Sequence, residues 1–442
     1  MFFSILTSVL ITYNSTADQT IHIPVEKFKL ENGLTVLLHQ DRSIPMISYH
    51  TWYKVGSRDE KPGVTGATHM LEHMMFKGAK KYSGKEFDQI LHENGITNNA
   101  FTSWDYTGFY QNLPSSKLEL MMDMEVDRMR FLNLSPEDLK SELQVVGEER
   151  RWRIDNQPVS KLREKMFELA YVKHPYGWPV IGWMKDIQEY TSEKLRHFYD
   201  TFYVPNNAVL VLAGDFDIEN TKKLIQKYYG SLPMRQVPEK KFPQEPDINK
   251  SKLVQIEDEV QATTVMVGYK GLESGHKDSY ALDLLANILG SGSSSRLYKN
   301  LIYKKEKAMS AGSYNITNVD PGLFMLYVQL KPGQKQEVAT KELDDEIQKI
   351  SRGVSSAELR KAKNMILKDF VDGLSTIDGK AQALAVNEIV FGDYTRLYSD
   401  LKKYEVVTIE DIKRVSQKYL KPEHKITAIL NPTQKTNQKK VK

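Results

Sequence analysis

The sequence contains no cysteine, and this absence removes several kinds of chemistry at once. Disulfide frameworks, cysteine-based zinc ribbons, iron–sulfur clusters and thiol nucleophiles are all excluded. Any metal site must be built from His, Asp and Glu side chains, and only ten histidines are present. The lack of free thiols also suits an exported protein.

An excess of one charge is missing too. Lys and Arg number 61 against 57 Asp and Glu, so the net charge of the 442-residue chain is only +4. This balance excludes a strongly basic nucleic-acid binder, and we expect no nucleic-acid partner. Hydrophobic residues make up 40% and charged residues 27%, which is typical of globular proteins and excludes wholesale disorder.

The chain also lacks an apolar run long enough to cross a membrane. The apolar residues 1–13 are too few for a spanning helix. They precede a small-x-small pattern at Ser15 and Ala17, which predicts a signal peptide over residues 1–17. We therefore expect export to the periplasm or the medium and no membrane span in the mature chain; the alternative is an apolar N-terminal strand in a cytoplasmic protein. Residues 433–442 are interpreted as a solvated basic tail.

Local patterns predict a mixture of strands and helices. Residues 28–38 should form a β-hairpin, because Asn32-Gly33 favours a turn with positive φ. Residues 98–113 should form two further strands. The segment 232–250 holds four prolines among charges and shows no periodicity, so it is interpreted as a linker.

The two halves of the chain repeat one pattern. A helix–strand joint at residues 191–205 recurs at 408–422, an offset of 217 positions, and an apolar strand near the start of each half shows the same offset. A shared offset at both ends predicts a duplicated domain. We expect one domain over residues 20–231 and a second, homologous domain over 251–432.

The main chemical signal is His69-Met-Leu-Glu72-His73. On a helix, side chains four positions apart share a face, so both imidazoles can hold one cation. Zn²⁺ favours two histidines, a carboxylate and an open position for water. Glu72 lies beside that face and can take a proton from a water that the metal activates. The motif therefore predicts hydrolysis of a peptide bond.

A third ligand is expected on the helix that Ser135 begins. This helix should continue to residue 154 and carries three candidates, Glu142, Glu148 and Glu149. Glu142 and Glu149 are two turns apart on one face, whereas Glu148 points about 100° away from Glu149. Glu149 can ligate the metal while Glu142 supports the site, and the alternative is that any one of them is an ordinary surface charge.

The motif His-x-x-Glu-His is the inverted form of the zincin signature. With it, nearly the whole chain resembles the pitrilysin–insulysin–mitochondrial processing peptidase family, in particular its short branch. The stretches that carry the resemblance are residues 56–58, 69–78, 99–103, 145–149 and 290–298. The resemblance implies an α+β fold of two similar domains from an internal duplication, each a mainly antiparallel sheet packed with helices.

The resemblance also implies the role of each site residue. His69, His73 and Glu149 would bind Zn²⁺, because the family's distal glutamate follows the second histidine at the spacing that selects Glu149 over its neighbour. Glu72 would be the general base and Glu142 the supporting catalytic carboxylate. The second half shows no such motif, so only the first half should bind metal.

Substrate contacts are expected at Asn99, Ala100 and Phe101. The alternation over residues 99–103 suits a strand, and in the family this edge strand pairs with an extended substrate. An exposed edge can accept a peptide by backbone hydrogen bonds. The alternative is that Asn98-Asn99 is simply a turn.

One feature departs from the family pattern. Short-branch members carry an Arg and a Tyr seven positions apart in the second domain, where this chain has Ile302 and Met309. The resemblance therefore implies a hetero-oligomer, in which a homologous partner chain supplies the Arg and Tyr. The alternative is that Tyr298 or Tyr303 has taken over.

These observations lead to one principal function and one rival. The principal hypothesis is a zinc-dependent endopeptidase that hydrolyses peptides or unfolded polypeptides in a closed chamber. The rival is a non-catalytic peptide-binding or scaffold subunit of a peptidase-like complex. The complete set of His69, Glu72, His73 and Glu149 favours the first.

Overall fold

The computed structural model describes residues 23–433, which form two similar α+β halves. The predicted signal peptide and nearly all of the predicted basic tail lie outside the described residues. The first half contains a six-stranded sheet in the order β1-β2-β6-β3-β5-β4. Its strands are β1 (Glu26–Lys29), β2 (Thr35–Gln40), β3 (Met46–Tyr53), β4 (Thr97–Thr102), β5 (Thr107–Pro114) and β6 (Ala208–Gly214).

The second half repeats this arrangement without the first strand. Its five-stranded sheet has the order β7-β11-β8-β10-β9. The strands are β7 (Lys252–Asp258), β8 (Thr264–Lys270), β9 (Ala308–Ile316), β10 (Leu323–Leu330) and β11 (Ile426–Pro432). Each sheet, as the described residues form it, has one parallel pair, made by the first and last strands of the repeat. In the first sheet β2 pairs with β6, with Thr35 facing Val209, and in the second β7 pairs with β11, with Lys252 facing Ile426. Both partners are displaced by the predicted 217 positions, so two similar α+β units are confirmed.

Helices cover the faces of both sheets. Those of the first half are α1 (Ala67–Met74), α2 (Gly84–Glu93), α3 (Leu118–Phe131), α4 (Pro136–Arg150), α5 (Pro158–Ala170), α6 (Met184–Gln188), α7 (Ser192–Phe202) and α8 (Ile218–Tyr229). Those of the second half are α9 (Ser279–Gly290), α10 (Gln336–Ile350), α11 (Ser356–Gly373), α12 (Ile377–Phe391), α13 (Arg396–Glu405) and α14 (Ile409–Tyr419). Within residues 23–433, no helix combines the length and the apolar character needed to cross a bilayer.

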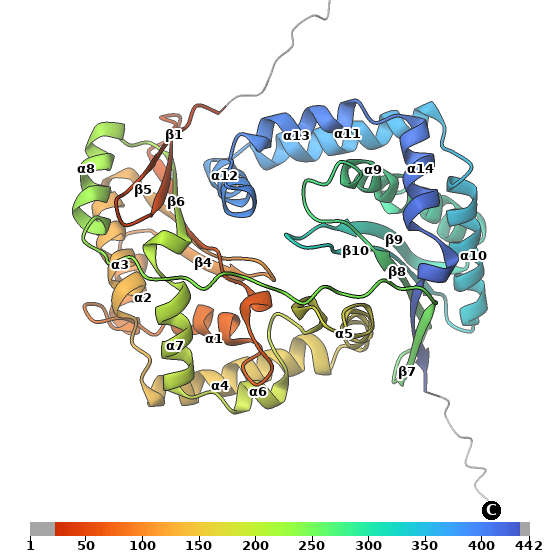
Figure 1. Ribbon diagram of the computed structural model, residues 1–442, viewed down its shortest axis with the longest axis horizontal. Helices are drawn as coiled ribbons and strands as arrows, with labels where there is room; N and C mark the ends of the chain where they lie inside the picture. The colour runs from red at the N-terminus through yellow and green to blue at the C-terminus, as the bar shows by residue number, and fades with distance from the viewer. Residues whose placement is uncertain (1–22, 434–442) are drawn as a thin grey trace, which may run out of the picture.

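The two halves exchange a helix. Helix α5 packs on β11 and β7 of the second sheet, and α12 packs on β6 and β3 of the first. The contacts are apolar: Leu162 and Met166 of α5 share a buried cluster with the second sheet, and Leu384 of α12 shares one with Trp52 and Val211. Residues 232–250, with neither helix nor strand, cross between the halves along the front in Figure 1.

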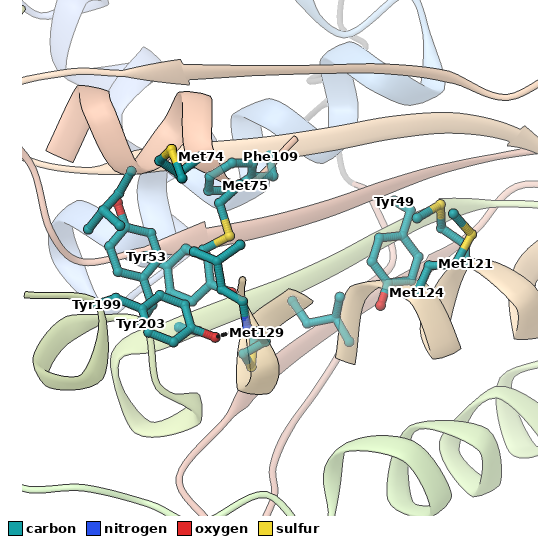
Figure 2. Packing of buried hydrophobic residues seen from close by; sticks show 14 of the residues in the cluster. Tyr49, Tyr53, Met74, Met75, Phe109, Met121, Met124, Met129, Tyr199 and Tyr203 are labelled. Atoms are coloured by element: carbon teal, nitrogen blue, oxygen red, sulfur yellow. Dashed lines mark hydrogen bonds between the residues drawn. The ribbon is translucent and has the colours of Figure 1, made fainter. Parts of the chain in front are cut away.

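Helix α1 stands on a core rich in methionine and tyrosine. Figure 2 shows Met74 and Met75 beside Phe109, with Tyr53 close by. Met70, Leu71 and Met74 are fully buried, so one face of the helix is held by the core while the other carries the histidines. Methionine fills such irregular spaces well because it is flexible and polarisable. The rigid anchoring of α1 therefore comes from its apolar face.

Several local predictions are confirmed and one is modified. The hairpin forms around Gly33, whose φ is 88°. Ser135 caps α4 by accepting from the Asp138 amide at 3.0 Å. The predicted continuous helix, however, leaves α-helical geometry at Arg151 and passes through a π-helical turn (Arg151–Asp155). This turn redirects the chain into α5, the helix that packs on the other half.

Candidate metal centre

The start of α1 is fixed by a buried carboxylate. Glu60 accepts hydrogen bonds from the backbone amides of Gly66 at 2.7 Å and Thr68 at 2.9 Å. These are amides that a helix leaves without an internal partner. Asp186 binds the preceding turn in the same way, through the amides of Gly63 and Thr65 at 3.1 Å each. The register of the histidines on α1 is thereby set.

Two glycines allow the loop before α6 to approach this start closely. A Cβ on Gly66 would lie 2.2 Å from the Ile181 oxygen, and one on Gly182 would lie 2.1 Å from the Thr65 oxygen. Both glycines have positive φ, near 87°. Larger residues would push the loop away from α1.

Three predicted ligands meet at one point. Glu149 Oε2 lies 3.2 Å from His73 Nε2 and 3.5 Å from His69 Nε2, although 76 residues separate Glu149 from His73. The potential ligand atoms of the three residues lie within 4.8 Å of one another. Helices α1 and α4 thus bring together two imidazoles and one carboxylate.

The donor set fits a zinc ion. Glu149 Oε2 is buried and makes no hydrogen bond within the described residues, although two imidazole nitrogens lie close to it. The three atoms therefore converge on a common position, within ion-pair distance of one another. Two histidines and a carboxylate leave one coordination position open, as in zinc sites that catalyse hydrolysis.

Charged neighbours hold the ligands in place. Glu142 Oε2 lies 3.1 Å from Nδ1 of His73, which orients that ring, and Lys77 forms an ion pair with the same carboxylate. Arg153 Nη1 lies 2.9 Å from Glu149 Oε1, the oxygen that points away from the histidines. Such partners orient metal ligands, and a carboxylate beside a histidine also raises the basicity of its ring. Glu142 thus lies where a supporting carboxylate is needed.

The electrostatics of this cluster of side chains favour a cation. Burial, with a smaller effect of His73, lowers the pKa of His69 to about 4. Burial also opposes charge on His73, but its interactions with the carboxylates of Glu142 and Glu149 outweigh this effect and raise the pKa of His73 to about 9. One positive charge is thus held at His73 between the two carboxylates, where a metal ion would place its own.

Glu72 occupies the position expected of a proton acceptor. Its carboxylate accepts a hydrogen bond from the hydroxyl of Thr102 at the end of β4. Burial raises the pKa of Glu72, and the bond from Thr102 partly offsets this. It lines the same cavity as the three ligand candidates without being one of the group that converges.

A cavity of about 850 Å³ opens in front of these residues. Strand β4 is the edge of the first sheet, and its residues Asn99, Ala100 and Phe101 line the cavity. The alternative turn at residues 98–99 is therefore wrong, since both lie within β4. The amide of Ala100 donates to the Asn99 side chain at 2.9 Å and not to β5, so its donor lies on the open side.

The second half also reaches this cavity. Tyr314 and Ile316 of β9 line it, together with Arg163 of α5 and Trp152, which is 68% exposed. Sequence reasoning missed these residues, because no local pattern marks them. The positions that it singled out in the second half, Tyr298, Ile302, Tyr303 and Met309, do not line the cavity.

Two models of one peptidase family match the chain, one after the other. The model described as Insulinase (Peptidase family M16) matches residues 35–182, and the one described as Peptidase M16 inactive domain matches residues 189–366. A zinc protease of Helicobacter pylori, PqqE, is 35% identical over 437 residues, covering 96% of this chain and 97% of that protein. The chain belongs to the M16 family of peptidases. The resemblance seen in the sequence is confirmed.

Solved structures agree with this membership. The crystal structure of a protease from Helicobacter pylori is 33% identical and superposes with a TM-score of 0.87, covering 93% of this chain and all of that one. The periplasmic protease PqqL from Escherichia coli has a TM-score of 0.77 at 19% identity. This M16 chain covers only 48% of PqqL, so that likeness concerns the fold alone.

Proposed function

We propose that this M16 peptidase is a zinc-dependent endopeptidase that cleaves peptides or unfolded polypeptides. The observation that carries the proposal is the convergence of His69, His73 and Glu149 in a cavity bordered by an open strand edge. The zinc protease relatives support the choice of metal. The domain limits, the residue roles and the partner discussed below belong to the same proposal.

Each residue has a distinct task. His69, His73 and Glu149 hold the metal, and Glu142 orients His73. A bound Zn²⁺ supplies a Lewis acid that polarises the scissile carbonyl and lowers the pKa of water. Glu72 removes the proton from the attacking water and later delivers it to the leaving amine. Its burial and the Thr102 hydroxyl hold it on the cavity wall.

The edge of β4 positions the substrate. An extended peptide adds to this edge as a further strand, using the outward donor of Ala100, and the Asn99 amide side chain turns from that donor to the peptide. Backbone pairing needs an extended chain, so unfolded segments are the expected substrates. A folded protein would not fit a cavity of about 850 Å³.

The decisive experiment is hydrolysis of an internally quenched peptide by the purified chain, with and without chelator. We expect turnover that the chelator abolishes and that added Zn²⁺ restores.

Glu72→Gln should keep zinc but lose activity by about 10²–10⁴-fold, the contribution of a general base. Activity within a few-fold of wild type in this variant would contradict the role of Glu72. Peptide binding without hydrolysis under all conditions would favour the scaffold function.

We also propose that the full rate needs a homologous partner chain. Ile302 and Met309 cannot donate a hydrogen bond to a developing oxyanion, and one such donor is worth about 10²–10³ in rate. The competing in-chain donor is Tyr314, which lines the cavity. Turnover of the isolated chain should therefore rise when a partner carrying Arg and Tyr is added. If the isolated chain turns over substrate as fast as the mixture, and Tyr314→Phe loses that activity, the hydrogen-bond donor to the oxyanion belongs to this chain instead.

We propose export as the cellular location. The support is the apolar segment 1–13 with its small-x-small site. Mass spectrometry of the mature protein from its native host should find a chain that begins after Ala17. A mature chain beginning at Met1 would place the enzyme in the cytoplasm.

A further inference from the structure

A second cavity, of about 740 Å³, lies between α7, the segment before α1 and the linker. We call it the linker cavity and define it by Lys61, Lys194, Phe198, Phe202 and residues 238–243. None of the three metal-ligand candidates lines it. It shares one lining residue with the metal cavity, Trp178, whose indole N–H donates to the Ser57 oxygen at 3.0 Å.

One wall of the linker cavity is apolar. Leu195, Phe198 and Phe202 follow each other at helical spacing, so they form one stripe along α7. Phe242 of the linker also lines the cavity, and the Arg58 guanidinium lies 4.7 Å from its ring centre. The two aromatic surfaces can take up apolar side chains that stand on alternate positions of an extended chain.

Some of the charges around the linker cavity are already paired. Arg58 binds Asp320 at 2.8 Å, and Lys240 binds Asp59 at 2.8 Å. Glu60 is occupied by the amides at the start of α1, and its pKa is raised to about 8 by burial. Glu239, which also lines the cavity, pairs with Lys241 at 2.9 Å, so each carboxylate of the cavity wall already has a partner.

Three lysines remain without a counter-charge. Lys61, Lys173 and Lys194 line the linker cavity, are exposed, and form no ion pair within residues 23–433. Lys194 Nζ donates only to a backbone oxygen, that of Glu189 at 3.2 Å. Their charges are complementary to a ligand that carries several carboxylates.

The linker adds backbone groups to the polar surface. Residues 238–243 form no helix or strand, and none of their backbone N–H or C=O groups makes a hydrogen bond within the described part of the chain. Prolines at positions 238 and 243 bound the segment and limit its freedom. Unpaired backbone groups of this kind can bind a peptide main chain in the manner of an added strand.

We propose that the linker cavity binds an extended acidic polypeptide segment in which carboxylates alternate with apolar side chains. The carboxylates meet Lys61, Lys173 and Lys194, the apolar side chains enter between α7 and Phe242, and the main chain pairs with residues 238–243. This site goes beyond the peptidase function, because it uses none of the metal ligands. Among amphipathic anions, the free linker backbone selects a peptide over a fatty acid.

The test is fluorescence anisotropy with a fluorescein-labelled nonapeptide that alternates glutamate with leucine and phenylalanine. The full chain is used in EDTA, so binding is measured without hydrolysis and its failure is separate from failure of the peptidase assay. We expect saturable binding that the double variant Lys61→Glu/Lys194→Glu weakens about tenfold, since each exposed pair contributes modestly. The matched control Lys85→Glu/Lys140→Glu changes two exposed lysines outside the linker cavity and should bind as wild type.

Three modified peptides sharpen the outcome. A nonapeptide with lysine in place of glutamate should fail on wild type and regain binding on Lys61→Glu/Lys194→Glu. Two further peptides carry N-methyl groups on alternate residues, one on the odd and one on the even positions. Only one of them should lose binding, because alternate backbone N–H groups of a strand face opposite sides. Equal weakening by both double variants, or unchanged binding of both methylated peptides, overturns the proposal. The proposal is also overturned if the acidic nonapeptide does not bind, while sodium oleate binds and Lys61→Glu/Lys194→Glu weakens the binding of oleate.

Discussion

At the scale of single residues, the helix decides which of two adjacent glutamates meets the histidines. Glu149 turns inward, where its side chain is 15% exposed beside His73. Glu148 turns outward, where its side chain is 73% exposed and pairs with Arg151. One residue along an α-helix is a rotation of about 100°, enough to move a carboxylate from the metal site to solvent.

This pair gives a matched test of the ligand assignment. Glu149→Gln should lose most of its zinc, because the amide oxygen carries no charge to balance the cation. Glu148→Gln makes the same chemical change one position away and should keep full occupancy. Metal analysis after dialysis measures both, and full zinc in Glu149→Gln would remove this residue from the ligand set.

The Nζ atom of Lys270, in the second half, is buried and has no hydrogen-bond partner in the described chain. It lies 3.6 Å from the ring centre of Tyr171. Burial lowers the pKa of Lys270 to about 7; Glu245 and Asp247 oppose this shift and Lys252 adds to it. The unfolded chain keeps this proton up to its usual pKa of 10.5, so between pH 7 and 10.5 the unfolded state binds more protons. The free energy of unfolding therefore rises with pH over this window.

Lys270→Met should remove that dependence. We expect the melting temperature at pH 7 to rise by about 2 °C, because methionine fills the same space without a buried charge, and the gain to shrink towards pH 9. Thermal melts at pH 6, 7, 8 and 9 measure this. Lys277→Met, at an exposed lysine without an ion pair in the described residues, is the control. A gain that does not vary with pH would contradict the linkage.

At the scale of elements, β4 combines an open edge with a direct contact to Glu72, the proposed general base. Thr102 at its end binds Glu72, and Ala100 in its middle keeps its donor on the open side. A proline is tolerated on an edge strand where its missing N–H would face outward. The outward N–H of Ala100 can therefore be removed without disturbing the pairing of β4 with β5.

Ala100→Pro should lower kcat/KM about tenfold or more while the melting temperature stays close to that of wild type. The physical reason is that the change removes a donor to substrate and no donor to β5. Ala100→Val keeps the donor and should retain activity. Steady-state kinetics with the quenched peptide, together with thermal melts, separate the two variants. Unchanged kcat/KM in Ala100→Pro would show that the substrate docks elsewhere.

At the scale of the molecule, the helix exchange makes each half incomplete by itself. The apolar face of the first sheet, with Trp52 and Val211, is covered by α12 from the second half. A sheet face of this kind exposed to water would be prone to aggregation. We therefore propose that the domain limits 20–231 and 251–432 describe an ancestral repeat, and not two units that fold independently.

Leu384→Ala tests this coupling, because Leu384 is fully buried in α12. A large-to-small change in a core costs about 2–5 kcal/mol of stability. We expect faster amide exchange in β3 and β6 of the first half as well as in the second half. Leu367→Ala, on the exposed side of α11, is the control. Faster exchange confined to the second half would contradict the coupling.

What the sequence by itself determined is local. His69 and His73 share a face because four positions make about one helical turn, and Ser135 begins α4 because a hydroxyl satisfies a free amide. The hairpin at Gly33 and the repeat of 217 positions follow from patterns of the same kind. In each case the interacting groups are near neighbours or recur at a fixed interval, so the residues alone carry the information.

The tertiary structure decided what meets across long separations. The packing of α1 on α4 brings Glu149 to His73, whereas the sequence alone left three glutamates open until the family resemblance was considered. The exchange of α5 and α12, and the arrival of Tyr314 in the metal cavity, had no counterpart in any local pattern. Such contacts depend on how whole apolar faces are buried against each other, and periodicity shows that a face is apolar without showing which surface covers it.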